Sequence, residues 1–452
     1  MNTPIVDFVK KYSQQKPLRL HMPGHKGNNF SGHENADITE IDGADVLYSA
    51  NGIIKQSEEN AATLFETQST FYSAEGSSLS IRAMLYLIKI FAVQQGKNPL
   101  IAAGRNAHKT FINACAVLDI KTDWLLPQNT KTVISCVITA DFLENYLKNA
   151  AEKPVAVYIT SPDYLGNITD IKALSAICRK YGVLLLVDNA HGAYLKFLNP
   201  DSHPITLGAD MCCDSAHKTL PVLTGGAYLH VSKNAPQFLS QNAQRALSLF
   251  ASTSPSYLIL QSLDAANHYL SDGYANRLAC FLTKLNALKT DLTDTGYCLT
   301  GDEPLKLTVM CKPYGYTGFQ IADILAKNNI FCEFSDPDYV VMMFTPETPA
   351  AGLKKLKRVL LNIPQKNALA DSPPQLMPKT QSISLKDAVF SAGEWINTEN
   401  SFSRISAMTD FACPPAVPVC IPGEKIDGNT LELFKYYNID RCFVITEKIH
   451  NE

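Results

Sequence analysis

Short apolar runs alternate with helical patterns through the middle of the chain. Runs of about four to eight residues that are rich in β-branched side chains favour buried strands. They are Leu100–Ala103, Val133–Ile138, Val155–Thr160, Val183–Asp188 and Gly226–Val231. Helical patterns separate them, most clearly at 142–151 and 170–181. A strand–helix–strand rhythm of this kind predicts an α/β fold with a mostly parallel sheet that helices cover on both faces.

The remaining segments suggest further domains around this core. Residues 1–65 form an N-terminal segment that opens with an amphipathic helix, and residues 66–290 form the large domain. Residues 291–363 have the pattern of a small α+β domain. Four prolines mark residues 364–380 as a linker, which leaves 381–452 as a C-terminal domain.

Composition gives no support to several classes of function. The 40 basic and 43 acidic residues leave a net charge of −3, and no basic patch or recognition motif indicates nucleic-acid binding. No stretch reaches the roughly 18 apolar residues that a membrane helix needs, and the polar N-terminus does not resemble a secretory signal. The 12 scattered cysteines include no CxxC pair. They indicate reduced thiols in a cytoplasmic protein, and no metal site is predicted.

Two charged residues stand at or after the ends of predicted strands. Asp188 closes the run Val183–Asp188, and Lys218 lies in the loop that begins at Asp214. Ligands of parallel sheets bind at the carboxyl ends of the strands. A lysine can hold the aldehyde of pyridoxal phosphate as a Schiff base, and a carboxylate can keep the ring nitrogen of this cofactor protonated. The alternatives are a surface lysine and an aspartate that caps a turn.

Several nearby residues suit a cofactor phosphate. Gly76-Ser77-Ser78 opens a helical pattern, and a helix N-terminus with hydroxyl groups can bind phosphate. Simple N-capping by Ser77 or Ser78 is compatible with that role. Ser215 and His217 supply donors close to Lys218.

Two further residues are candidates on weaker grounds. His108 follows the run Leu100–Ala103, so it is expected at the carboxyl end of a strand, where it either stacks on a planar cofactor or is a hydrogen-bonded loop histidine. Glu424, in Pro422-Gly423-Glu424, offers a carboxylate to a cationic substrate, with a surface turn as the alternative.

Seven motifs, in order along the chain, resemble the Orn/Lys/Arg decarboxylase family. They are LHMPGHKG at 20–27, GSS at 76–78, GRNAHKT at 104–110, VDNAHGAYL at 187–195, GADMCCDSAHKTL at 208–220, STSPSYLILQSLDAA at 252–266 and CIPGEKI at 420–426. The chain is similar to the shorter, Gram-positive-type members. The resemblance implies a PLP-dependent transferase fold of the aspartate aminotransferase type (fold type I). It also implies pyridoxal 5'-phosphate as cofactor and the decarboxylation of lysine, arginine or ornithine.

The resemblance also implies a role for each matching residue. Lys218 would form the internal aldimine, Asp188 would pair with the pyridine nitrogen, and His108 would stack on the ring. The residues expected to hold the phosphate are Ser77, Ser78, Ser215 and His217. The residues expected to pack beside the ring are Ala190 and His191.

Three more residues extend these implied roles beyond the cofactor. Thr253 and Ser254 would reach the cofactor pocket of a neighbouring subunit, which implies a homodimer or a larger homo-oligomer. Glu424 would bind the distal cation of the substrate. Whether His217 or Lys218 returns the proton to Cα is left open.

The chain departs from the family pattern at several positions. Asn189 replaces a usual Glu, Ala216 a usual Thr and Glu75 a usual Asn. The segments Tyr48-Ser49-Ala50 and Cys413-Pro414-Pro415-Ala416 also differ from it. The cofactor contacts are intact, so these departures leave the side-chain specificity open.

Two alternative functions remain open, and the departures favour the second of them. One is another PLP reaction on the same fold, such as transamination or β-elimination. An aminotransferase needs an arginine for the α-carboxylate, and Arg404 lies in the C-terminal region. The other is a PLP-binding protein without catalysis.

Overall fold

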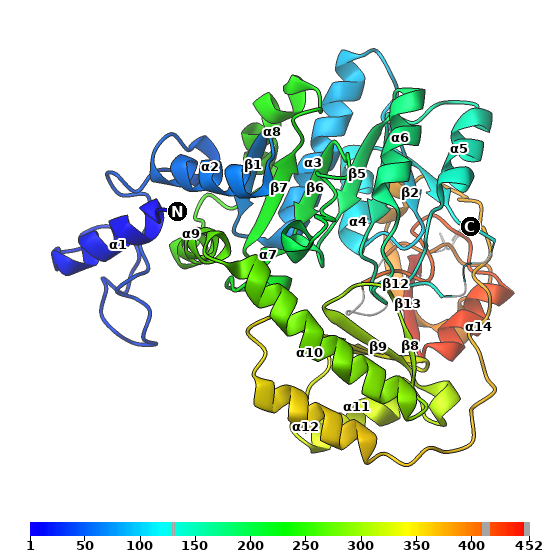
Figure 1. Ribbon diagram of the computed structural model, residues 1–452. Coiled ribbons are helices and arrows are strands. Elements are labelled where there is room, and N and C mark those ends of the chain that lie inside the picture. The colour runs from blue at the N-terminus through cyan, green and yellow to red at the C-terminus, as the bar shows by residue number, and fades with distance from the viewer. Residues whose placement is uncertain (129, 131, 409–415, 447–452) are drawn as a thin grey trace. The chain divides into compact units, whose positions relative to one another are not determined.

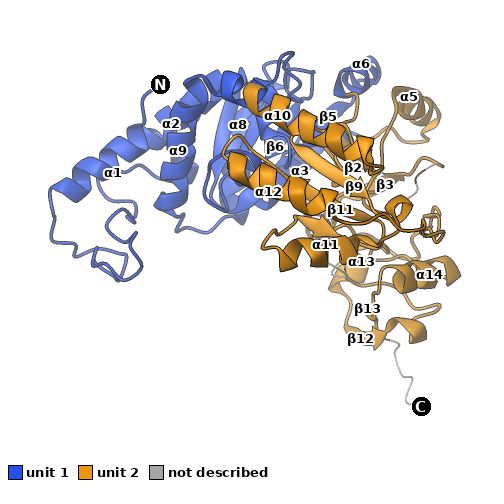
Figure 2. Ribbon diagram, turned by 60° about the horizontal axis from the view of Figure 1, so that its bottom comes forward, with its two compact units in different colours: residues 1–98, 155–157, 171–279 blue, residues 99–154, 158–170, 280–452 orange. Residues whose placement is uncertain are grey.

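The computed structural model describes residues 1–128, 130, 132–408 and 416–446. Cys413, Pro414 and Pro415 lie outside these residues. The chain divides into two compact units that alternate along the sequence (Figure 2). Unit 1 comprises residues 1–98, 155–157 and 171–279, and unit 2 comprises residues 99–154, 158–170 and 280–452. The domain boundaries given above stay a prediction.

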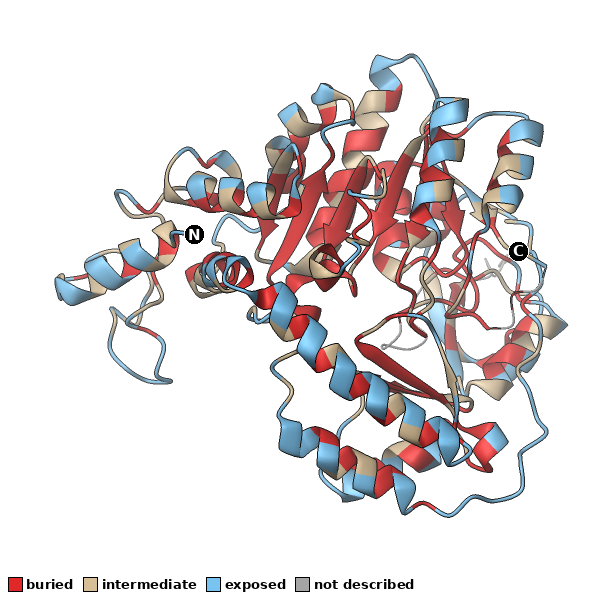
Figure 3. Ribbon diagram, in the orientation of Figure 1, coloured by how far each residue is buried: buried red, intermediate tan, exposed pale blue. Residues whose placement is uncertain are grey.

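Unit 1 carries four neighbouring strands of a seven-stranded sheet. Their order is β1 (Ser69–Ser73), β7 (Ala227–Val231), β6 (Met211–Asp214) and β5 (Leu184–Asp188) (Figure 1). β7 runs antiparallel to β1 and β6, whereas β6 and β5 are parallel. β1, β5 and β6 therefore run in the same direction, and their carboxyl ends share one edge. Most of their residues are buried (Figure 3), which explains the near-continuous apolar sequence of β5.

The helices of unit 1 are α1 (Pro4–Gln14), α2 (Ile53–Phe65), α3 (Gly76–Gln94), α6 (Ile171–Tyr181), α7 (Ala216–Thr219), α8 (Gln237–Phe250) and α9 (Tyr257–Ser271). The residues of α10 (Tyr274–Asp294) divide between the two units. α3 is long and apolar enough to cross a membrane, but half of its apolar window is buried inside the protein. It contacts α8 and β7, as the core helix of an α/β domain does.

Asp264, on α9, holds the first turn of α1. Its Oδ2 accepts hydrogen bonds from the backbone N–H groups of Ile5 (2.9 Å) and Val6 (3.0 Å). Its Oδ1 accepts one from Ser57 Oγ at 2.5 Å. The first N–H groups of a helix have no partner within the helix, so a carboxylate at this end satisfies them and interacts favourably with the helix dipole. Because Asp264 is fully buried, water cannot replace it.

We expect Asp264→Ala to lower the free energy of unfolding by about 3 kcal/mol, because two buried donors and one partly buried donor lose a charged acceptor. Denaturant unfolding of the purified variant measures this. The control is Asp272→Ala at the exposed end of the same helix, which should change stability by less than about 0.5 kcal/mol. Equal effects of the two substitutions would contradict the assigned role of Asp264.

Unit 2 contributes two parallel strands of the seven-stranded sheet, β2 (Leu100–Gly104) and β3 (Lys121–Leu125). A separate antiparallel sheet has the order β10 (Phe334–Ser335), β11 (Tyr339–Met343), β9 (Lys306–Met310) and β8 (Cys298–Thr300). The strands β12 (Gly393–Asn397) and β13 (Arg441–Ile445) form an antiparallel pair. The helices are α4 (Lys109–Leu118), α5 (Ala140–Asn149), α11 (Gly318–Lys327), α12 (Ala350–Leu361), α13 (Leu385–Phe390) and α14 (Gly428–Tyr436). The residues of β4 (Ala156–Thr160) divide between the two units.

The architecture confirms the α/β class with a mostly parallel central sheet. The predicted strand Val133–Ile138 is wrong, because these residues form a turn and irregular chain. Val133 and Ile134 are nevertheless buried, in an apolar cluster of unit 2 that includes Phe334 and Phe434. An apolar run indicates that its residues are buried, and these residues are buried without forming a strand.

Candidate active site

Asp188 closes β5 at the edge where the carboxyl ends of the parallel strands meet. It is 3% exposed, and its partner in register on β6 is Cys213. Asp188 Oδ1 accepts a hydrogen bond from the Ala190 N–H at 3.2 Å and lies 3.6 Å from the Cys213 thiol. Burial and the charge of Asp188 raise the pKa of this thiol, so it stays protonated and donates. A buried carboxylate costs free energy unless it has a polar partner, so a protonated ring nitrogen suits this position.

Lys218 lies on α7, the short helix that follows β6. Its backbone N–H donates to the Ser215 carbonyl at 3.0 Å. Its Nζ lies 2.8 Å from Nε2 of His191, a buried residue on the loop after β5. The structure therefore brings the predicted residues Lys218 and His191 into contact, and the loop that carries His191 begins at Asp188.

Ser77 and Ser215 also meet. The Ser215 hydroxyl donates to Ser77 Oγ at 2.8 Å. Ser77 and Ser78 lie in the first turn of α3, which begins at Gly76 with a φ of 70°, a backbone conformation that favours glycine. The Gly76 N–H donates to the Gly225 carbonyl at 2.7 Å. Hydroxyl groups and the N-terminus of a helix of 19 residues form a site suited to an anion.

His217 is fixed by the loop before β7. Its Nδ1 lies 3.0 Å from the Gly226 carbonyl, which can only accept, so Nδ1 carries the ring proton and donates it. Burial, and to a smaller extent the Lys218 charge, lower the pKa of His217. The ring is therefore neutral at pH 7, and the lone pair is on Nε2.

Thr253 and Ser254 lie on an exposed loop between α8 and α9. The loop is attached to the start of α3, because the Ser252 N–H donates to Glu75 Oε1 at 2.7 Å. Glu75 immediately precedes Gly76, so this exposed loop borders the anion site of unit 1.

The donor set of unit 1 fits pyridoxal phosphate. Lys218 offers an amine for the aldehyde, Asp188 offers a carboxylate for the ring nitrogen, and Ser77 and Ser215 offer hydroxyl groups for the phosphate. β1 leads into α3, β5 ends at Asp188 and β6 leads into α7, and these three strands run in the same direction. All three chemical groups therefore stand at one edge of the sheet, where ligands of such folds bind.

His108 lies in unit 2, where it caps α4. Its Nδ1 accepts a hydrogen bond from the Thr110 N–H at 3.1 Å. The Nδ1 lone pair is therefore engaged, and the proton of the neutral ring is on Nε2. The His108 side chain is partly buried.

Glu424, also in unit 2, is buried and already has a cationic neighbour. Its Oε2 accepts a hydrogen bond from the Ile421 N–H at 2.8 Å and lies 3.7 Å from Arg105 Nη2. Arg105 donates to the carbonyls of Pro418 and Val419 as well. The alternative of a surface-turn glutamate is therefore wrong.

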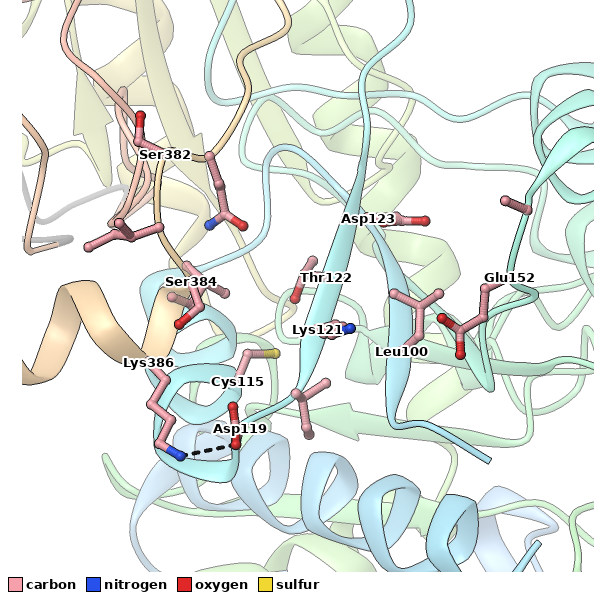
Figure 4. A pocket seen from close by; sticks show the side chains of 15 residues that line it. Leu100, Cys115, Asp119, Lys121, Thr122, Asp123, Glu152, Ser382, Ser384 and Lys386 are labelled. Atoms are coloured by element: carbon pink, nitrogen blue, oxygen red, sulfur yellow. Dashed lines mark hydrogen bonds and ion pairs between the residues drawn. The ribbon is translucent and has the colours of Figure 1, made fainter. Parts of the chain in front are cut away.

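Unit 2 also contains a cavity of about 620 Å³ beside β3 (Figure 4). Charged residues of both signs line it, and an ion pair of 3.0 Å joins Lys386 to Asp119 at one side. None of the predicted site residues lines this cavity. Its mixed charge points to no particular ligand.

One buried polar cluster of unit 1 consists of residues that the sequence did not predict for the site. It joins Asp214, which precedes Ser215, to His203 and His230. The sequence analysis missed this cluster, because it placed Asp214 at the start of a loop and not at the end of the buried strand β6.

This chain is similar to a known protein family, to individual proteins and to solved structures. Residues 3–299 match a family model described as "Orn/Lys/Arg decarboxylase, major domain". The chain is 29% identical over 475 residues to an arginine decarboxylase of Bacillus subtilis, and the alignment covers 97% of this chain and 94% of the relative.

Solved structures show the same fold at low sequence identity. A lysine decarboxylase of Francisella novicida superposes with a TM-score of 0.78 at 17% identity, covering 98% of this chain and 81% of that one. A serine palmitoyltransferase of Sphingomonas wittichii gives a TM-score of 0.57 at 13% identity, covering 79% of this chain and 82% of that one.

Proposed function

The chain belongs to the Orn/Lys/Arg decarboxylase family, and from this premise we propose that it removes the α-carboxylate of L-arginine, L-lysine or L-ornithine. It is an amino acid decarboxylase, a lyase that uses pyridoxal phosphate. The observation that carries the site assignment is the grouping of Lys218, His191 and Asp188 at one edge of the unit 1 sheet.

We assign the residues of unit 1 the following parts in this reaction. When bound, the cofactor accepts the electron pair that is released as the bond between Cα and the carboxylate breaks. Asp188 holds a proton on the ring nitrogen through its negative charge, and Ser77, Ser78 and Ser215 bind the phosphate. Lys218 would hold the cofactor through its amine, which His191 orients. Lys218 Nζ is our candidate to deliver the proton to Cα, because Nε2 of the neutral His217 ring carries a lone pair and no proton.

For the substrate, we propose arginine first, because the curated relative reported above is an arginine decarboxylase. Glu424 is our candidate for the distal cation. Arg105 lies beside one of its oxygens, so a substrate guanidinium or ammonium would bind the other. A planar guanidinium has more donors than an ammonium for pairing with a carboxylate.

We also propose that the smallest active unit is a homodimer and that the enzyme acts in the cytoplasm, where its product amine supplies polyamine synthesis. The exposed loop of Thr253 and Ser254, attached next to the anion site, is suited to reach a neighbouring subunit. His108 is proposed to stack on the cofactor ring, with Ala190 beside it.

The substrate assay measures amine and carbon dioxide release from each of the three amino acids by the PLP-loaded protein. We expect one substrate to be used at least about tenfold better than the others, because a misplaced or missing charged hydrogen bond costs about 1.5–3 kcal/mol. Arginine is the expected one. Preference for lysine or ornithine would correct the substrate and leave the reaction in place.

Two results would remove the proposed reaction itself. A keto acid product without carbon dioxide would indicate an aminotransferase. Arg404, the earlier candidate for binding an α-carboxylate, instead pairs with Glu394 at 2.8 Å. Normal PLP binding with no turnover of any amino acid would indicate a binding protein without catalysis.

A further inference from the structure

Asp214 is the centre of a buried polar cluster in unit 1. Asp214, His203 and His230 are each 0% exposed. Asp214 Oδ2 lies 3.0 Å from His203 Nε2 and 3.3 Å from His230 Nε2. The sheet register builds this arrangement, since His230 on β7 is paired with Cys212, and Asp214 follows two positions later on the same face of β6.

Asp214 also holds the loop that carries Asp188. Its Oδ1 accepts a hydrogen bond from Asn189 Nδ2 at 2.7 Å, and Asn189 is fully buried. The Asn189 backbone is fixed too, because its N–H donates to the Cys213 carbonyl at 3.0 Å and its carbonyl accepts from the Gly192 N–H at 2.8 Å. A Cβ at Gly192 would lie only 2.0 Å from Asn189 Oδ1. Asn189 is thus held between Asp214 and Gly192.

The surrounding donors allow Asp214 to remain charged inside the protein. Burial alone would raise the pKa of this carboxyl, but His203 and His230 lower the pKa of Asp214 below its usual range. The Ile205 N–H donates to His203 Nδ1 at 3.4 Å, which places the ring proton of His203 on Nε2, toward Asp214. A metal ion would need that Nε2 lone pair. The hydrogen bonds therefore favour a carboxylate–histidine network over a metal site.

We propose that Asp214 is a positioning residue of the cofactor site. It holds the Asn189 amide, and through Asn189 it fixes the loop from Asp188 to His191 relative to Lys218. Asp214 is the last residue of β6 and the neighbour of Ser215, so one carboxylate joins the end of β5 to the end of β6. This inference rests on the proposed roles of Asp188 and Lys218, and it explains how unit 1 keeps them in place.

A double-mutant cycle tests the proposal. The variants Asp214→Asn, Asn189→Ala and the double variant are compared with the unaltered protein. The readout is PLP affinity, measured by adding PLP to the apoprotein and following the visible absorption of the bound cofactor. Asp264→Asn is the matched control, because Asp264 is a buried carboxylate of the same unit that holds α1.

We expect each single substitution to weaken PLP binding about tenfold, which is the loss of one charge-assisted hydrogen bond. The double variant should bind PLP as tightly as the single variant with the lower PLP affinity, because both substitutions break the same contact. Asp264→Asn should lower the melting temperature and leave PLP affinity unchanged.

Additive losses in the double variant, or unchanged PLP affinity in Asn189→Ala, would overturn the proposal. If Asp214→Asn does not fold, Asn189→Ala still decides, because it leaves the contacts of Asp214 with the two histidines intact. One equivalent of zinc in the unaltered protein, lost in Asp214→Asn, would also overturn it in favour of a metal site. A wrong assignment of Asp188 to the cofactor site would give a different result from a wrong role for Asp214. In that case Asp188→Ala would bind PLP as tightly as the unaltered protein.

Discussion

Lys218→Ala should abolish the release of amine and carbon dioxide, with turnover falling by about 10³-fold or more. Lys218 is assigned two tasks, covalent attachment of the cofactor and proton transfer, and general acid–base catalysis alone contributes about 10²–10⁴-fold. The variant should still bind PLP through Ser77 and Ser215, because these contacts do not involve the amine. The measurement is the turnover number on the preferred substrate, together with the amount of cofactor retained.

The control for this substitution is Lys233→Ala, which removes an exposed lysine of the same unit and should leave turnover unchanged. Attachment is tested separately by borohydride reduction of the PLP-loaded protein, followed by peptide mass analysis. We expect the added mass on the peptide that contains Lys218. Added mass on another lysine, or full activity in Lys218→Ala, would show that the anchor is misassigned.

The sequence predicted those strands whose burial on both faces leaves a near-continuous apolar run. β5 and β7 are of this kind, and both were expected within a residue or two of their observed bounds. β3 was not expected, because Lys121 and Asp123 are exposed on it and interrupt the pattern. The run Val133–Ile138 failed for the opposite reason, since it is apolar and buried but forms no strand. Periodicity records burial, and strand pairing depends on tertiary contacts that it does not contain.

The candidate site was predictable where chemistry and sequence position coincide. Asp188 stood out as a charged residue that ends an apolar strand, and Lys218 stood out within a motif. The contact between Arg105 and Glu424 was not predictable, because the two residues lie far apart in the sequence and in separate motifs. The contacts of Asp214 with His203 and His230 depend on the register of β6 with β7, which is a property of the folded sheet.

Asp188→Asn should reduce the turnover number by about 10³-fold while much of the cofactor remains bound. The substitution preserves the shape of the side chain and removes its charge. An opposite charge beside a ring nitrogen favours the protonated ring, and this effect is strong in a buried site such as that of Asp188. Without it, the ring nitrogen loses its proton near neutral pH and the ring withdraws electrons less well. Steady-state turnover on the preferred substrate measures the loss.

Asp210→Asn provides the matched control for Asp188→Asn. Asp210 precedes β6, at the opposite end of the strand from Lys218, and its Oδ2 accepts a hydrogen bond from the Leu185 N–H at 2.7 Å. This substitution should cost about 1–2 kcal/mol of stability and leave the turnover number unchanged. If Asp188→Asn behaves like Asp210→Asn, less stable but equally active, then the charge of Asp188 has no part in the reaction. Loss of activity in Asp188→Asn alone would instead show that catalysis requires a negative charge at the end of β5.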